Sequence, residues 1–198
     1  REAQIGRNKA EAAQETLSRL NSDIEIVGIS KRMDGANITS LLEGVSLAMD
    51  CADSFAISYT LSDACLEKQI PMISASVLGF SGYVGGFCGN APSLRALFPD
   101  LPDRAANCST AGVMGPVVGT LGCMQAQMVL NYLLDLKPSP LGQCMTLDCA
   151  TYHTSGFRFD NAPEPIDDIL KFIQDELVAY CQNGHYICDK IGFGAKQL

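Results

Sequence analysis

Segments with the periodicity of helices and of strands alternate along the first 80 residues of this chain. Apolar residues recur every three or four positions over residues 7–20 and 55–68, which indicates helices, whereas residues 23–29 alternate apolar and polar side chains as a half-buried strand does. Residues 45–49 and 71–76 are short apolar runs typical of buried strands. Strands separated by helices form βαβ units, so this part of the sequence predicts a largely parallel sheet.

The rest of the chain predicts antiparallel pairing and a long helix. Residues 80–87 have the composition of another strand, and residues 143–148 and 156–159 are expected to pair as two antiparallel strands. A short helix capped by Asn37 is expected early in the chain, and an apolar helix over residues 119–134. The sequence therefore predicts an α/β fold with a mixed sheet, parallel first and antiparallel later, flanked by helices.

Composition narrows the class of protein. With 198 residues, of which 47% are hydrophobic, the chain is long enough to bury a core of its own. A net charge of -8 disfavours binding to nucleic acid, and no apolar run reaches the roughly 18–20 residues that a membrane span needs. The nine cysteines are odd in number and include no Cys-x-x-Cys pair. This pattern argues against a disulfide framework and favours buried free thiols in a cytoplasmic protein.

The apolar run 45–49 is followed by two carboxylates, Asp50 and Asp53. Ligands of open α/β sheets bind beyond the carboxyl ends of parallel strands, so these acids stand where a functional site is expected. A carboxylate there can hold Mg²⁺, which prefers oxygen ligands and neutralises nucleotide phosphates. The alternative is structural: either acid would cap a helix that begins near Ser54.

A long loop is expected over residues 88–110, and loops of this length are usually functional or disordered. The loop carries Cys108 among polar neighbours, just ahead of a segment rich in Gly and Pro. Reactivity of a thiol requires the thiolate, which solvent access and a nearby helix N-terminus both favour. Cys108 is thus a candidate nucleophile, and an uninvolved loop cysteine is the alternative.

Three segments resemble the ThiF/MoeB/HesA family, the bacterial relatives of ubiquitin-activating E1 enzymes. They are IGRNKAEA at 5–12, MDCADSF at 49–55 and NCSTAGVMGPVVG at 107–119. The resemblance covers about residues 5–160 and implies a Rossmann-like E1 fold, usually in a homodimer. It also implies ATP-dependent adenylation of the C-terminal glycine of a small ubiquitin-like sulfur carrier protein, of the thiamine or molybdopterin type.

The resemblance implies roles for three residues. Asp53 matches the acid that is linked to Mg²⁺ and is essential for adenylation, so it is both a catalytic and a metal-binding candidate. Lys9 matches the lysine that reaches the ATP phosphates, although from the residue alone it is equally a solvated helix lysine. Cys108 matches a cysteine that can link covalently to the carrier. The implied cofactors are ATP and Mg²⁺.

The chain departs from the family in two respects. Ser93 and Ala96 stand where many members have the first Cys-x-x-Cys pair of a structural zinc site, and no second pair follows Phe159, so no zinc is expected. The Gly-rich nucleotide loop of the family would lie upstream of Arg1. We therefore expect residues 1–162 to be an adenylating domain without its N-terminal part, inactive by itself.

Prolines 163 and 165 predict a boundary before a tail at 163–198. The tail resembles in part the active-site loop of rhodanese sulfurtransferases, so it is interpreted either as a remnant of such a domain or as an ordinary amphipathic tail. Two other functions stay open. One is a non-catalytic carrier-binding or dimerisation fragment, and the other is a dinucleotide-dependent oxidoreductase of the same topology.

Overall fold

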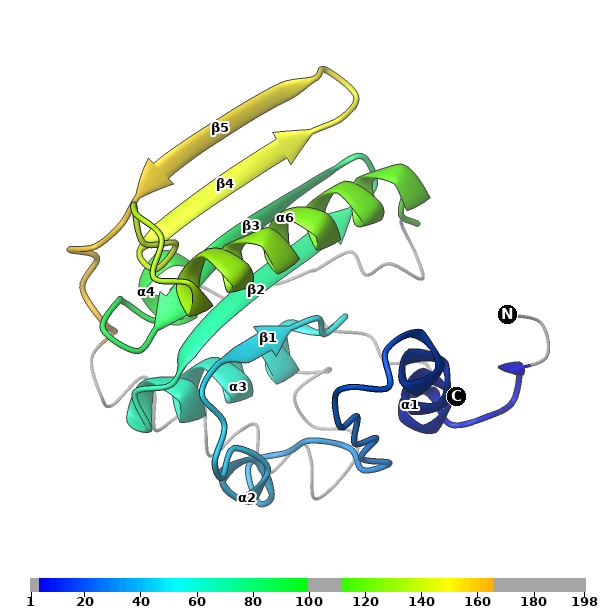
Figure 1. Ribbon diagram of the computed structural model, residues 1–198. Coiled ribbons are helices and arrows are strands. Elements are labelled where there is room, and N and C mark those ends of the chain that lie inside the picture. The colour runs from blue at the N-terminus through cyan, green and yellow to red at the C-terminus, as the bar shows by residue number, and fades with distance from the viewer. Residues whose placement is uncertain (1–3, 100–111, 166–198) are drawn as a thin grey trace, which may run out of the picture. The chain divides into compact units, whose positions relative to one another are not determined.

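Figure 1 shows the computed structural model of the chain, which describes residues 4–99 and 112–165. The chain divides into two compact units, Arg1–Met33 and Asp34–Leu198. Within the described ranges, no helix is long and apolar enough to cross a bilayer. The tail at 163–198 lies almost wholly outside those ranges, so its boundary and its likeness to a rhodanese loop stay predictions.

The first unit is built on helix α1, Lys9–Leu20. The helix begins two residues later than the periodicity predicts, because Asn8 caps it. The Asn8 side-chain oxygen accepts hydrogen bonds from the backbone N–H groups of Ala10 (2.9 Å) and Glu11 (3.4 Å), two of the donors that a helix start leaves without partners. The start of this helix is therefore determined by a local side chain rather than by the apolar spacing.

The predicted strand at 23–29 is wrong, since this segment has no regular secondary structure. It lies instead along α1, where the Gln14 side-chain amide donates to the Ile26 carbonyl at 2.7 Å. Gly28 approaches the same helix so closely that an added Cβ would lie 2.8 Å from the Ala10 carbonyl oxygen. A strand needs a neighbour to satisfy its backbone groups, and no described strand pairs with this segment.

The second unit contains a sheet of five strands in sequential order. The strands are β1 (Ala48–Asp50), β2 (Pro71–Leu78), β3 (Ser81–Cys88), β4 (Gln143–Asp148) and β5 (His153–Arg158). Strands β1 and β2 are parallel, and every later pair is antiparallel. The mixed sheet is confirmed, but its parallel part is this single pair, because the segment at 23–29 adds no strand to it (Figure 1).

Helix α3 (Phe55–Glu67) connects the two parallel strands, as predicted. The short helix α2 (Ile38–Leu41) follows Asn37, which stands at the predicted cap position, but the Asn37 side chain makes no capping hydrogen bond and accepts one from the Asp34 N–H instead. Another short helix, α4 (Leu94–Leu97), interrupts the predicted long loop. Both α3 and α4 lie near one face of the sheet: the Tyr59 hydroxyl of α3 donates to the Phe98 carbonyl at 2.8 Å, and the Phe98 ring lies 5.1 Å from the ring of Tyr83 on β3.

Helix α6 (Gly115–Leu133) packs on the other face, across β2 and β3 (Figure 1). It begins four residues earlier than predicted because a proline stands in its first turn, where the missing N–H costs nothing. One stripe of the helix is buried, at Val117, Leu121, Gln125 and Met128. Its apolar members form the core of the unit with Ile73, Val84 and Leu141.

Candidate active site

A cavity of about 400 Å³ opens beyond the carboxyl ends of β1 and β2, at the edge of the sheet where the sequence predicts a site. The turn from β1 into α3 forms one wall, and the end of β2 with Tyr83 forms another. Helix α6 supplies Val118, Leu121, Gly122 and Gln125. The cavity therefore collects backbone and side chains from segments more than 70 residues apart in the sequence.

Asp50 has a structural role beside this cavity, at the end of β1. It is only 2% exposed. One carboxylate oxygen accepts a hydrogen bond from the Ala52 N–H at 3.1 Å, and the other accepts one from the Ser74 hydroxyl at 2.8 Å. The first bond closes the turn after β1, and the second ties β1 to β2. Both oxygens are thus committed to the protein itself.

Asp53, three residues on, is exposed and lines the cavity. Ser54, not Asp53, occupies the position before the first residue of α3, so capping this helix is not the role of Asp53. Within the described ranges, no hydrogen bond or ion pair engages the Asp53 carboxylate. Of the two predicted acids, only Asp53 presents an uncommitted carboxylate to the cavity.

Tyr83 also lines the cavity, and its hydroxyl lies 3.2 Å from the Ser74 hydroxyl oxygen. Ser74 has a single proton, which it donates to Asp50, so Tyr83 must be the donor in its bond with Ser74. Burial raises the pKa of Tyr83, which keeps the phenol protonated for that role. A relay of two hydroxyls therefore connects the cavity wall to the buried Asp50 carboxylate.

The Gln125 side chain was not identified by the sequence reasoning, although it makes three contacts at this site. Its amide nitrogen donates to the carbonyls of Asp50 (2.8 Å) and Ile73 (2.9 Å), and its oxygen lies 3.6 Å from the Cys51 thiol, which donates to it. Partial desolvation, with a further contribution from Asp50, raises the pKa of Cys51. The available signal in the sequence was a polar residue at a buried position of an apolar helix.

Lys9 is the first residue of α1 and is exposed. Lys9 belongs to the first unit and Asp53 to the second. The structure describes each unit by itself, so it does not define a distance between these two side chains. An exposed lysine at this place is free to bind an anion, but its contact with a phosphate stays a prediction.

Cys108 lies outside the described residues, so its role also stays a prediction. The residues that flank this part of the chain do lie beside the cavity. On one side, Phe98 contacts Tyr83. On the other, Gly79 donates its N–H to the Gly112 carbonyl at 3.1 Å, and the neighbouring Val113 lines the cavity.

At Ser93, where many family members have a zinc ligand and none is expected in this chain, the structure has a different contact. Ser93 is buried, and its backbone N–H and hydroxyl both donate to the carboxylate of Glu164, at 2.7 and 2.6 Å. This pair of hydrogen bonds joins the start of α4 to the chain beyond β5. Among the described residues, no group of three or more His, Cys, Asp or Glu side chains is arranged to hold a metal ion.

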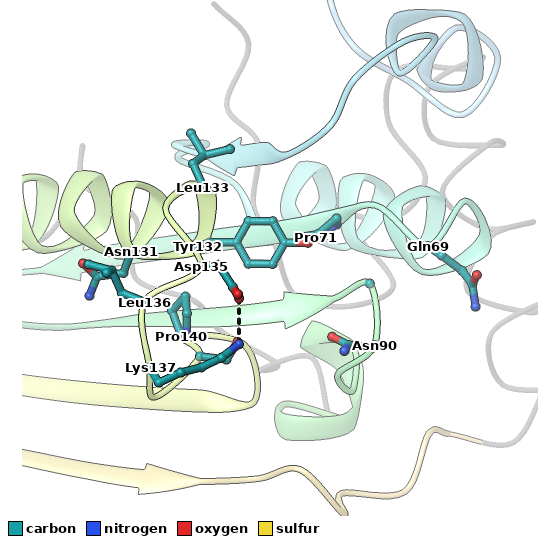
Figure 2. Close-up of a pocket in the computed structure, with 12 residues that line it drawn as sticks. Gln69, Pro71, Asn90, Asn131, Tyr132, Leu133, Asp135, Leu136, Lys137 and Pro140 are labelled. Carbon is teal, nitrogen blue, oxygen red and sulfur yellow. Dashed lines mark hydrogen bonds and ion pairs between the residues drawn. The ribbon is translucent and has the colours of Figure 1, made fainter.

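A second cavity, of about 600 Å³, lies at the opposite end of the sheet, between the ends of α3 and α6 (Figure 2). Its only described ionic contact is that of Lys137 with Asp135 at 2.7 Å, and both side chains are largely exposed. None of the predicted site residues lines this cavity. Although it is larger, it offers no carboxylate or thiol comparable to those of the first.

Comparison with known proteins shows what the chain resembles. Residues 1–165 match the ThiF family. The chain is 32% identical to the sulfur carrier protein ThiS adenylyltransferase of Escherichia coli, over 73% of this chain and 58% of the relative. It is 32% identical to the molybdopterin-synthase adenylyltransferase of Salmonella typhimurium, over 76% and 61%. It is 30% identical to the SAMP-activating enzyme E1 of Haloferax volcanii, over 78% and 58%.

The fold has solved counterparts. The crystal structure of E. coli MccB with ATP superposes with a TM-score of 0.66 at 17% identity, covering 82% of this chain and 51% of that one. The complex of MccB with N-formylated MccA has a TM-score of 0.67. At such low identity, the likeness concerns the fold alone. The chain spans 58–61% of the length of the three relatives named above.

Proposed function

Because the chain belongs to the ThiF family, we propose that the protein containing it adenylates the C-terminal glycine of a ubiquitin-like sulfur carrier protein, using ATP. The observation that carries this proposal is Asp53, an exposed carboxylate without a protein partner among the described residues, in a cavity at the carboxyl ends of two parallel strands. Relatives named as adenylyltransferases of the thiamine and molybdopterin type support it.

An acid at this position suits the proposed reaction. A carboxylate oxygen of the carrier attacks the α-phosphorus of ATP, a new oxygen–phosphorus bond forms, and pyrophosphate leaves with the electrons of the bond that breaks. Asp53 would hold Mg²⁺, which neutralises charge that develops on the phosphates. A single uncommitted carboxylate suits this ion, because Mg²⁺ at nucleotide sites is bound by one or two carboxylates together with the substrate phosphates.

The size and lining of the cavity are compatible with the proposal. Its volume of about 400 Å³ is that of a ligand site, and the small residues Ala52, Ala75 and Gly122 line part of its wall. Lys9 would steady the ATP phosphates, and Cys108 would form the covalent bond to the carrier that the family resemblance implies. Both assignments are part of the proposal.

We also propose that the protein is a homodimer. The face of α6 away from the core exposes large apolar side chains, with Leu130 at 51% and Leu133 at 59%. Packing within the unit accounts for the opposite stripe of α6 but leaves these residues uncovered. A Leu130→Glu variant should shift the protein from dimer to monomer in analytical ultracentrifugation. A wild type that is monomeric at micromolar concentration would contradict this part of the proposal.

The described cysteines are all free, as is usual in a reducing compartment, and we propose a cytoplasmic location on this basis. No structural zinc is proposed. The hydrogen bonds from Ser93 to Glu164 link the segments that a zinc site would link in the family. Metal analysis of the purified protein by mass spectrometry tests this, because stoichiometric zinc would contradict it.

Pyrophosphate exchange into ATP tests the main proposal. The protein in its natural full length should catalyse exchange that depends on a carrier with a C-terminal glycine. Asp53→Asn should abolish it and leave the thermal midpoint unchanged, since the side chain is exposed and makes no described contact. A full-length protein that exchanges with neither thiamine-type nor molybdopterin-type carriers would contradict the proposed reaction.

A second candidate function is carrier binding without catalysis. It is favoured by the partial overlap of the chain with its relatives, whose remaining length contributes residues that this chain does not match. Calorimetry on these 198 residues distinguishes the two candidates. Micromolar affinity for ATP would contradict the second, whereas binding of a carrier without ATP would support it.

A further inference from the structure

Gln125 is a buried polar side chain whose hydrogen-bonding capacity is directed at the turn that carries Asp53. It is 4% exposed and occupies a position of the α6 stripe that otherwise holds Val117, Leu121 and Met128. A neutral amide has two N–H donors and one acceptor oxygen. The Gln125 nitrogen donates twice, which uses both donors, and its oxygen accepts once.

The two carbonyls that Gln125 contacts belong to neighbouring strands at the point where they separate. Asp50 is the last residue of β1, and Met49 is paired with Ile73 on β2. Beyond Asp50 the chain turns toward α3. The Asp50 carbonyl therefore has no further strand pairing that could satisfy it. Gln125 takes up this carbonyl together with that of Ile73, and so joins both strands to α6.

The next residue along the turn is held as well. Cys51 donates its thiol proton to the Gln125 oxygen, and Ala52 donates its N–H to the Asp50 carboxylate. Each of the three residues that precede Asp53 therefore has a fixed contact, and two of the three contacts come from Gln125. The exposed carboxylate of Asp53 stands at the end of a short segment anchored to the buried stripe of α6.

We infer that Gln125 is a positioning residue for Asp53. It holds the course of the chain from Asp50 to Asp53, and so would determine where the Asp53 carboxylate is presented to a bound Mg²⁺. This inference rests on the proposed function of Asp53. A residue of this kind acts on metal affinity without touching the metal, and loss of such outer contacts typically costs roughly 10- to 100-fold in affinity or activity.

The test uses two variants and a matched control in the protein at its natural full length. Gln125→Met keeps the length and apolar stem of the side chain and removes the donors and the acceptor. Gln125→Glu keeps the acceptor and removes the donors to the two carbonyls. Gln127→Met is the control, because Gln127 lies on the same helix, is exposed, and donates only to Asn131 at 2.7 Å.

The first measurement is carrier-dependent pyrophosphate exchange as a function of Mg²⁺ concentration. Both Gln125 variants should need roughly 10- to 100-fold more Mg²⁺ for half-maximal exchange, while the control should match the wild type. A purely structural role for Gln125 predicts a different result: the maximal rate would fall with the folded fraction, and the Mg²⁺ requirement would stay the same. That outcome would overturn the inference.

The second measurement is hydrogen–deuterium exchange of the peptide that covers residues 50–55, which requires no activity. The Gln125 variants should exchange faster in this peptide than the wild type, with the strands β3 and β4 unchanged. If the wild type shows no pyrophosphate exchange, the proposed function fails, but this peptide still reports whether Gln125 holds the turn. Unchanged protection in both Gln125 variants would overturn the inference, whatever the enzyme assay shows.

Discussion

The ion pair between Arg95 and Asp63 allows a quantitative prediction about what anchors α4. The Arg95 side chain is 1% exposed and that of Asp63 is 10% exposed. Two parallel hydrogen bonds join them, from Nε to Oδ1 at 2.7 Å and from Nη2 to Oδ2 at 2.8 Å. The guanidinium carbon also lies 4.4 Å from the centre of the Tyr59 ring. Helix α4 is thus held on α3 by a charge that has no access to water.

Asp63→Asn removes the negative partner and keeps the shape of the side chain. It leaves the guanidinium buried with a neutral neighbour, and breaking a buried pair in this way costs about 3–5 kcal/mol of unfolding free energy. In a protein of this size each kcal/mol lowers the melting temperature by roughly 2–4 °C, so a decrease of about 6–20 °C is expected. Because Phe98 contacts Tyr83, a loosened α4 should also weaken one wall of the cavity.

The double variant Asp63→Asn with Arg95→Met separates the cost of a stranded charge from the cost of lost packing. It leaves no charge at this position, so it should recover most of the stability that the single variant loses. Asp160→Asn is the control, because the pair of Asp160 with Arg158 has side chains that are 47% and 45% exposed, and surface pairs contribute little. Urea and thermal unfolding followed by circular dichroism provide the measurements.

Two results would refute this reasoning. If Asp63→Asn lowers the melting temperature no more than Asp160→Asn does, the Arg95 pair is not desolvated as the structure has it. If the double variant is as unstable as the single one, the stabilisation comes from packing of the two side chains and not from pairing of a buried charge.

Further predictions concern thiols and glycines. Burial raises the pKa of Cys65 and of Cys88 to about 12, so at pH 8 iodoacetamide should label the exposed Cys123 and leave both buried thiols unmodified until the protein unfolds, as peptide mass mapping will show. An ordinary thiol has a pKa of 9.0, so the unfolded chain loses these protons at lower pH than the folded protein does. The contribution of the two buried thiols to the free energy of unfolding is therefore fully present below pH 9 and should be lost between pH 9 and 12. Urea midpoints measured across this pH range test the prediction. Gly82→Ala places a Cβ against the backbone of β2 and should lower stability by about 1–3 kcal/mol. Gly119→Ala meets no atom within 4 Å in α6 and should raise it by about 0.5–1 kcal/mol; the same unfolding assay compares the two.

The elements that the sequence predicted well are those whose pattern is local. The helix expected at 55–68 is α3, Phe55–Glu67, because apolar residues at helical spacing and the adjacent stop signals lie within one segment. The strand expected at 143–148 is β4 with the same bounds. The segment at 23–29 has an equally clear alternation, yet a strand also depends on a neighbour, which no local pattern can supply.

The start of α6 and the presence of α4 were not predicted correctly, because both depend on individual residues rather than on apolar spacing. The beginning of α6 at Gly115 was predicted four residues too late, because glycines disfavour helix while a proline is accepted in the first turn. Helix α4 was missed within the long loop. It is only four residues long, and the side chains that hold it, Asp63 and Glu164, come from elsewhere in the chain.

The family motifs and the placement of two acids after an apolar strand were determined by the sequence by itself, because residue identity and short-range order are sufficient to recognise them. Only the tertiary structure distinguished Asp50 from Asp53. They stand three residues apart after the same strand, but Ser74, 24 positions from Asp50, occupies one oxygen of the first acid, and Gln125, 75 positions away, binds its carbonyl. Such contacts depend on which side chains the fold brings together at one edge of the sheet, and that is decided by packing over the whole unit rather than by any segment of it.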